Sequence, residues 1–162
     1  MIVLGIDPGL ATIGYGIIES TEIKNKEKSS FKYLDCGLIK TTPLLKLPER
    51  LQKINNELSK LIKKYQPNIL VMEKIYFFKN FKTVIPVSQA QGVIMLTAAK
   101  NKIPVFGFTP LQVKLAVTGF GRAEKTVLQE RIKKVLGLKE LPKEDDAADA
   151  LGVALTYLIK EV

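Results

Sequence analysis

The chain begins with a short apolar run that ends in an acid and a turn: Ile2-Val3-Leu4-Gly5-Ile6-Asp7-Pro8-Gly9. This pattern predicts a first β-strand, from which the rest of the fold can be followed. A second apolar run at residues 14–18 follows closely, so the two runs predict a hairpin. Residues 31–39 alternate in a way that predicts a third strand. The N-terminal part of the chain is therefore expected to form a three-stranded meander.

Helical periodicity replaces the strand pattern after the meander. Apolar residues recur at three- and four-residue steps over residues 47–65, which predicts a helix with one buried face that ends before Pro67. Residues 68–72 form an apolar run that ends in Glu73, which predicts a buried strand followed by an acid. Two apolar strands of the predicted sheet thus end in a carboxylate.

The C-terminal half continues as alternating helix and strand. The patterns predict a helix at 83–100, a strand at 105–109, a helix at 123–136 that ends at Gly137, and a last helix at 145–159. A meander followed by alternating elements predicts an α/β layer fold with a mixed five-stranded sheet flanked by helices. We expect residues 1–162 to form a single domain.

Composition excludes several classes of protein and of chemistry. The chain has 162 residues, of which 46% are hydrophobic and 25% charged, and no apolar run approaches the ~20 residues that span a bilayer. No basic segment precedes the first apolar run, so a cytoplasmic protein without a membrane association is expected. With one cysteine and no histidine, the sequence excludes zinc peptidases and hydrolases that use a histidine base.

The net charge of +9 favours a polyanionic partner, most often nucleic acid. The alternative interpretation is that the lysines only cover solvated helix faces, as in many basic proteins. Charge alone leaves these two interpretations equally supported. The placement of the less numerous acids therefore has to decide between them.

The acids are concentrated at the ends of predicted elements. Asp7 and Glu73 each end an apolar strand, and Asp145, Asp146 and Asp149 open the last helix. Asp146 and Asp149 share one helical face, and the alanines between them let that helix lie close to a sheet. Taken singly, each acid is explained as a turn former or helix cap. Together they predict one pocket of four carboxylates.

Clustered carboxylates need a cation, and the ligand type selects it. Two like charges ~4 Å apart repel by roughly 4 kcal/mol near a protein surface. Oxygen ligands without nitrogen or sulfur favour Mg²⁺, with Mn²⁺ as a substitute. Two such ions per site activate water and neutralise charge in phosphodiester hydrolysis. The residues therefore predict a metal-dependent nuclease.

Four motifs in the same order resemble the RuvC family of Holliday-junction resolvases. They are Leu4-Gly5-Ile6-Asp7-Pro8-Gly9 with Gly14-Tyr15-Gly16, Met72-Glu73-Lys74-Ile75-Tyr76, Ala123-Glu124-Lys125, and Asp146-Ala147-Ala148-Asp149-Ala150-Leu151. The resemblance runs along essentially the whole chain. It implies a ribonuclease H-like fold and a homodimeric crossover junction endodeoxyribonuclease, which resolves four-way junction DNA by symmetric Mg²⁺-dependent nicking of two opposed strands in recombination and repair. It also implies junction-binding and branch-migration proteins as partners.

The resemblance assigns roles to individual residues. The catalytic and metal-binding carboxylates are Asp7, Glu73, Asp146 and Asp149, whereas Asp145 receives no role. The DNA-binding candidates combine family positions with neighbouring bases and are Tyr76, Lys79, Lys82, Lys114, Arg122 and Lys125. Tyr76 stands where the family more often has phenylalanine and keeps a ring that stacks on a base. Gln91 stands where arginine is common, which argues against a phosphate contact there.

Three other functions fit parts of the pattern. A nuclease of the same fold that acts on RNA or on RNA hybrids has the same carboxylates. An actin-like nucleotide-binding protein has a similar N-terminal hairpin, but it needs a second domain to clamp its nucleotide. A junction-binding scaffold without activity does not need four acids. The carboxylate set therefore favours the junction nuclease.

Overall fold

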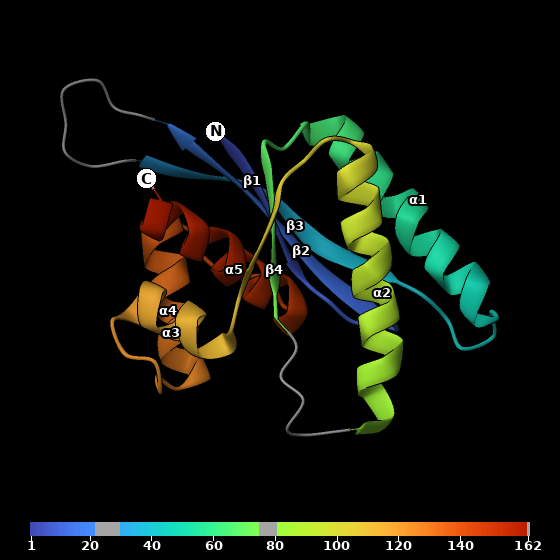
Figure 1. Cartoon of the computed structure of the whole chain (residues 1–162). Helices are drawn as coiled ribbons and strands as arrows, with labels where there is room; N and C mark the ends of the chain where they lie inside the picture. The colour runs from blue at the N-terminus through green and yellow to red at the C-terminus, as the bar shows by residue number, and fades with distance from the viewer. Residues whose placement is uncertain (22–29, 75–80, 162) are drawn as a thin grey trace.

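The computed structural model describes residues 1–21, 30–74 and 81–161, with side chains for all of these except residues 81–83 and 161. Its strands are β1 (Ile2–Asp7), β2 (Thr12–Thr21), β3 (Ser30–Lys40), β4 (Ile69–Glu73) and β5 (Val105–Phe108). Its helices are α1 (Leu47–Tyr65), α2 (Phe81–Lys100), α3 (Pro110–Thr118), α4 (Lys125–Leu136) and α5 (Asp145–Glu161). Figure 1 shows the sheet between two groups of helices.

The sheet is mixed, as predicted. Within the described residues it has the strand order β3-β2-β1-β4-β5, with β1, β2 and β3 antiparallel and β4 and β5 parallel to β1. The parallel pairing follows from the helical crossovers, because a strand that returns through a helix enters the sheet in the same direction. β1 and β4 therefore end at the same edge of the sheet, and Ile6 pairs with Met72 just before their terminal acids.

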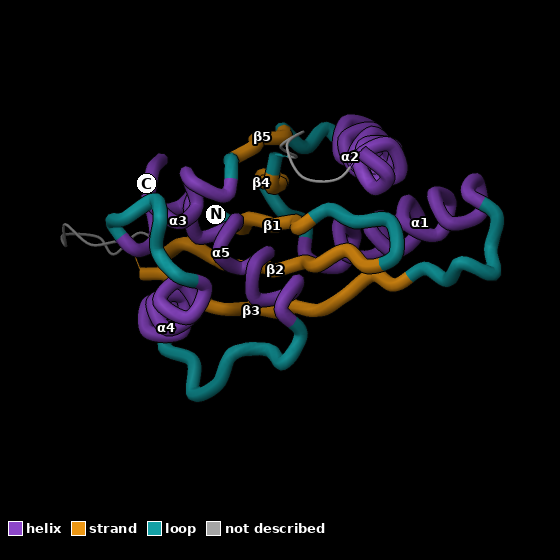
Figure 2. The backbone as a smooth tube through the Cα atoms, turned by 90° about the horizontal axis from the view of Figure 1, so that it is seen from below, coloured by secondary structure: helices purple, strands orange, loops and turns teal. Residues whose placement is uncertain are grey.

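Helices cover both faces of the sheet, so the strands carry apolar residues on both sides. Leu4 and Ile6 pack with the cluster under α1 and α2, whereas Val3 packs with the cluster under α3, α4 and α5. β4 alternates in the same way, with Leu70 in the first cluster and Val71 in the second. The view in Figure 2 shows α5 crossing β1 and β2. This alternation decides which side chains face α5.

Glycines let α5 lie against the backbone of β1 and β2. A Cβ atom on Gly5 would lie 2.1 Å from the Ala150 carbonyl oxygen, and one on Gly14 would lie 1.9 Å from the Asp146 carbonyl oxygen. On the helix side the contact is made by small residues, since Ala147 and Ala150 are both fully buried. The expectation that the alanines bring this helix close to the sheet is thus correct. The glycines complete the contact.

Residues 110–118 form a helix, α3, that the sequence patterns did not predict. Its N-cap Thr109 accepts a hydrogen bond from the Gln112 backbone N–H at 3.1 Å, while the Gln112 side chain accepts from the Thr109 N–H at 2.9 Å. Pro110 occupies the first helical turn, where its missing N–H costs nothing. This capping box was present in the sequence, but its first residue, Thr109, was assigned to the end of the preceding strand.

Smaller differences concern the ends of elements. α2 begins at Phe81 rather than at residue 83, and α4 begins at Lys125 rather than at residue 123. The later start of α4 has a local cause, because the Ala123 N–H bonds to the Phe120 carbonyl in a turn. α5 extends two residues beyond the predicted end, to Glu161. In the described part of the chain, no helix combines the length and apolarity that crossing a membrane requires.

The contact between Gly14 and α5 is testable through stability. Gly14→Ala places a methyl group on the Asp146 carbonyl, so α5 must move, and we expect a loss of about 1–3 kcal/mol or more. Gly107→Ala is a matched control, because the new Cβ meets only the flexible Lys74 side chain. Urea unfolding measures both variants. Equal stability of Gly14→Ala and the unsubstituted chain would contradict this packing.

Candidate active site

The first two carboxylates are placed by the alternation of strand side chains. Gly5 lies under α5, so Asp7, two residues on, points to the same face of β1. On β4, Val71 packs in the cluster under α5, so Glu73 also points to that face. The register that pairs Ile6 with Met72 puts these two acids side by side at the sheet edge. The predicted proximity of the two strand ends is therefore present.

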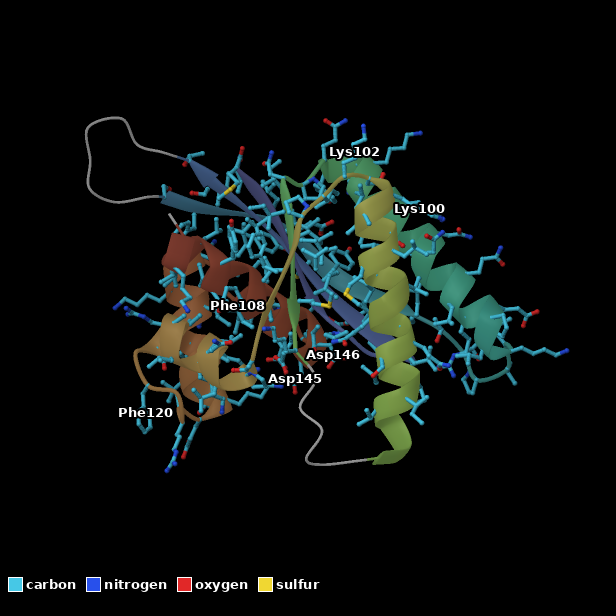
Figure 3. The ribbon with its side chains drawn as sticks, in the orientation of Figure 1. Lys100, Lys102, Phe108, Phe120, Asp145 and Asp146 are labelled. Carbon is cyan, nitrogen blue, oxygen red and sulfur yellow. The ribbon has the colours of Figure 1, made fainter. Side chains whose placement is uncertain are left out.

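The other two carboxylates come from the first turns of α5. The buried Ala147 and Ala148 fix the rotation of the helix and leave Asp146 and Asp149 half-buried beside the strand ends. Figure 3 places Asp145 and Asp146 at the end of the molecule where β4 ends. Acids in the first turn also interact favourably with the helix dipole. One helix terminus and two strand ends thus form the site.

Burial and neighbouring carboxylates raise the pKa of three of these acids, Asp7, Glu73 and Asp149. Burial raises the pKa of Asp7 to about 7, and the charges of Glu73, Asp149 and Asp146 add to the effect. Burial and the charge of Asp149 likewise raise the pKa of Glu73 to about 7. Both groups normally titrate near pH 4. The shifts indicate negative charge that the surrounding protein does not neutralise.

Lys125 is the cation that the described residues place in this cluster. Its Nζ lies 3.1 Å from Asp149 Oδ2 and 3.3 Å from Asp145 Oδ2. Burial nevertheless outweighs this ion pair at Asp149, whose pKa is raised. Asp145 also accepts a hydrogen bond from Gln129 at 3.2 Å. Asp145 is exposed and ties α4 to α5 through these contacts, which gives this residue a structural role that the sequence left open.

The donor set of the four carboxylates suits a hard divalent cation. Among the described residues, no group of three or more acidic or cysteine side chains is arranged to hold a metal ion. The charges of Glu73, Asp149 and Asp146 still act on Asp7, and the raised pKa values of Asp7, Glu73 and Asp149 indicate negative charge that a cation would compensate. An all-oxygen donor set favours Mg²⁺ or Mn²⁺. The residues therefore fit the predicted metal.

Gln91 has a role that sequence reasoning missed. Its Nε2 donates a hydrogen bond of 3.0 Å to the backbone carbonyl of Glu73, so α2 holds the end of β4. The same side chain borders a hollow of about 380 Å³ between α2, β4 and β5. The expectation that Gln91 makes no phosphate contact stays a prediction. Its position makes it a support for the backbone that carries Glu73.

The predicted DNA-binding residues divide into two groups. Lys114 is half-buried on α3, Arg122 is exposed between α3 and α4, and Lys125 opens α4 beside the acids. These three come from neighbouring elements on the α5 side of the sheet. Tyr76 and Lys79 lie outside the described residues, as does the side chain of Lys82. Their roles stay predictions.

The raised pKa of Asp7 predicts how stability depends on pH. Its folded pKa of about 7 exceeds the ordinary value of 3.8, so the native state loses stability as pH rises between these values. Without divalent ions, Asp7→Asn should therefore stabilise the protein by about 2–4 kcal/mol near pH 8 and by less near pH 5. Urea unfolding in the presence of a chelator measures this difference.

The control for that experiment is Glu140→Gln, which removes one negative charge from an exposed position. It should change stability little at either pH. Adding Mg²⁺ should reduce the advantage of Asp7→Asn, because a bound cation stabilises only the ionised cluster. An advantage of Asp7→Asn that stays constant with pH would show that Asp7 is not destabilised by its surroundings.

Comparisons with known proteins identify the family and the fold. Residues 3–157 match the family described as crossover junction endodeoxyribonuclease RuvC. A relative of that name from Caldicellulosiruptor saccharolyticus is 48% identical over 98% of this chain and 93% of its own length. The solved Thermus thermophilus RuvC is 30% identical, with a TM-score of 0.90 over 98% of this chain and 94% of that one.

A second solved structure contains T. thermophilus RuvC in complex with a Holliday junction substrate. It matches this chain with a TM-score of 0.90 and 30% identity, over 98% of this chain and 93% of that one. The predicted resemblance is thus confirmed over nearly the whole chain, together with the ribonuclease H-like fold that it implied. The match includes both strand ends and the helix that carry the four carboxylates. This chain belongs to the RuvC family of crossover junction endodeoxyribonucleases.

Proposed function

We propose that this protein resolves four-way DNA junctions by metal-dependent hydrolysis, with symmetric nicks in two opposed strands. The observation that carries the proposal is the meeting of Asp7, Glu73, Asp146 and Asp149 at one end of an otherwise basic protein. The family relationship supplies the substrate class, since a relative of the same fold was solved with a Holliday junction. The activity belongs to recombination and repair of DNA.

The proposed catalytic groups are the four carboxylates, which would hold Mg²⁺, or Mn²⁺ in its place, as two ions per site. When bound, the ions supply an activated water and neutralise charge at the scissile phosphate. Asp7 and Glu73 would supply carboxylate oxygens to the metal from the rigid ends of β1 and β4. Asp146 and Asp149 would approach from α5. With no histidine in the chain, hydrolysis relies on carboxylates for this positioning.

We propose that Lys114, Arg122 and Lys125 hold the phosphates of the strand at the site. Lys125 supports this role because its ammonium already lies among the carboxylates, 3.1 Å from Asp149. A lysine in that position can contact a phosphate oxygen while it remains paired with an acid. Tyr76 would stack on a base, and Lys79 and Lys82 would add phosphate contacts. The phosphate contacts position the DNA without reading its sequence.

The decisive test uses synthetic four-way junctions labelled on each strand. With Mg²⁺ the protein should nick two opposed strands at symmetric positions, and Asp146→Asn should abolish cleavage while it still binds the junction. Glu140→Gln should cleave normally. Absence of symmetric nicks, or nicking that persists in Asp146→Asn, would refute the proposal. Preferred cleavage of RNA or of RNA hybrids in competition would instead indicate the related nuclease class.

We also propose that the protein acts as a homodimer through the exposed face of α2. This face carries Ile85, Met95 and Leu96, which are 67%, 47% and 54% exposed. Residues 83–99 contain no charged residue, in a chain that is 25% charged. Gly92 lies in the same stripe, and a Cβ atom added to it would meet nothing within 4 Å, which leaves room for a close helix.

A second copy of this chain is the occupant that fits the α2 face best. An uncharged stripe does not attract DNA, whereas identical apolar helices pack well against each other. Two symmetric cuts also need two active sites related by a two-fold axis, which an isologous dimer provides. The partner's α2 would lie against this one across Gly92. The proposed dimer and the proposed reaction thus require the same symmetry.

Leu96→Glu tests the α2 face. A charge in the centre of an apolar contact should shift the protein from dimer to monomer, by about tenfold or more in the dissociation constant. Leu44→Glu is the control, because Leu44 is 93% exposed and lies outside α2. Sedimentation or light scattering measures the mass. An unchanged dimer in Leu96→Glu would place the contact elsewhere.

The remaining proposals concern the surroundings of the enzyme. We propose that residues 1–162 act as one nuclease domain in the cytoplasm, together with junction-binding and branch-migration proteins. The membership of the RuvC family supports these partners, which the resemblance also implies. The basic surface supports the DNA partner, because a net charge of +9 attracts a polyanion over a distance.

A further inference from the structure

The turn between α3 and α4 presents an aromatic side chain to solvent. Phe120 is 61% exposed, and Leu111 and Leu115 on α3 are 56% and 51% exposed. A single exposed apolar residue needs no explanation. Three of them on one helix and its following turn form a larger apolar surface. The question is what this surface contacts in the working protein.

The backbone around Phe120 is held on both sides. Gly119 ends α3 in a left-handed conformation with φ 82°, and its N–H bonds to the Leu115 carbonyl at 2.9 Å. The Phe120 N–H donates to Thr118 Oγ1 at 3.1 Å, and the Phe120 carbonyl accepts from the Ala123 N–H at 3.1 Å. The ring is therefore presented from a fixed turn.

Two basic residues follow the ring closely in the sequence. Arg122 follows two residues later and is exposed, and Lys125 begins the next helix beside Asp149. Next to the turn is a hollow of about 650 Å³, lined by Thr118, Thr126, Val127, Glu130, Arg131 and Lys134. Figure 3 shows Phe120 directed away from the body at the same end of the molecule as Asp145 and Asp146. The ring thus lies on the turn that leads into α4, whose first residue, Lys125, contacts the carboxylates.

We propose that Phe120 stacks on an unpaired base of the junction strand next to the scissile phosphate. The inference rests on the proposed function and names a substrate contact that the four motifs do not include. Arg122 and Lys125 would hold phosphates on either side of the stacked nucleotide. The ring would limit where the strand lies, and it would favour bases that leave the stack easily at the cut.

A nucleic-acid strand fits this surface better than a protein does. An apolar partner would cover Phe120 but would also desolvate the exposed Arg122 without offering it an opposite charge, which is costly. A DNA strand offers a flat apolar base face and a negatively charged backbone together. Aromatic rings placed among basic side chains are a general device for holding single-stranded nucleic acid. The combination of ring and cations therefore favours DNA.

The test compares Phe120→Ala with Phe120→Trp, each in the inactive Asp146→Asn background so that the junction remains intact. The junction carries 2-aminopurine next to the expected cut. We expect Phe120→Ala to bind about tenfold more weakly and to lose the fluorescence change at that base. Phe120→Trp should restore both. Leu44→Ala serves as the control for an exposed apolar truncation far from the α3–α4 turn.

Three results would overturn the inference. The parent protein is Asp146→Asn with Phe120 unchanged, called here the Phe120 parent. If Phe120→Ala binds the junction and changes the fluorescence as this parent does, the ring makes no contact with DNA. Failure of Phe120→Trp to restore them, with unchanged thermal stability, would exclude stacking. An equal loss of affinity for fully paired duplex DNA would exclude an unpaired base. If the Phe120 parent itself does not bind junctions, the proposed function fails, and this result is distinguishable from the others.

Discussion

The close contact between α5 and the backbone of β1 and β2 is the constraint on which the site depends. Side chains on the strands would hold a helix about 10 Å from a sheet, as stacked layers usually lie. Gly5 and Gly14 remove those side chains where α5 crosses, and alanines remove them from the helix. The first turns of α5 therefore reach the strand ends. Without this contact, Asp146 and Asp149 would not lie near enough to Asp7 for their charges to act on it.

The clustered carboxylates lower the stability of the folded protein, but they suit the proposed binding of a cation. Burial and mutual repulsion raise the pKa values of Asp7 and Glu73, so the ionised cluster is a cost to the folded protein. Lys125 reduces that cost only in part, because it pairs with Asp149 and the outward-lying Asp145. The same uncompensated charge is what would attract a divalent cation to the proposed site. A cluster fully neutralised by protein side chains would have no such attraction.

Much of the fold and the identity of the candidate acids could be predicted from the sequence, because both follow from local periodicity. Alternation puts Asp7 and Glu73 on one face, and helical spacing puts Asp146 and Asp149 together. The contacts between distant residues could not be predicted in this way. The hydrogen bond from Gln91 to Glu73 joins residues 18 apart, and that from Lys125 to Asp149 joins residues 24 apart. Such pairs depend on how whole elements pack, which no local pattern specifies.

α2 connects the two proposals about assembly and chemistry. One of its faces, around Gly92, is free of charge and suits a second copy of the chain. Next in sequence, Gln91 holds the carbonyl of Glu73, so the helix at the proposed dimer contact also supports a strand of the active site. A movement of the two copies relative to each other would thus reach the carboxylates through one side chain. This path would couple the proposed paired cuts to the assembly of the proposed dimer.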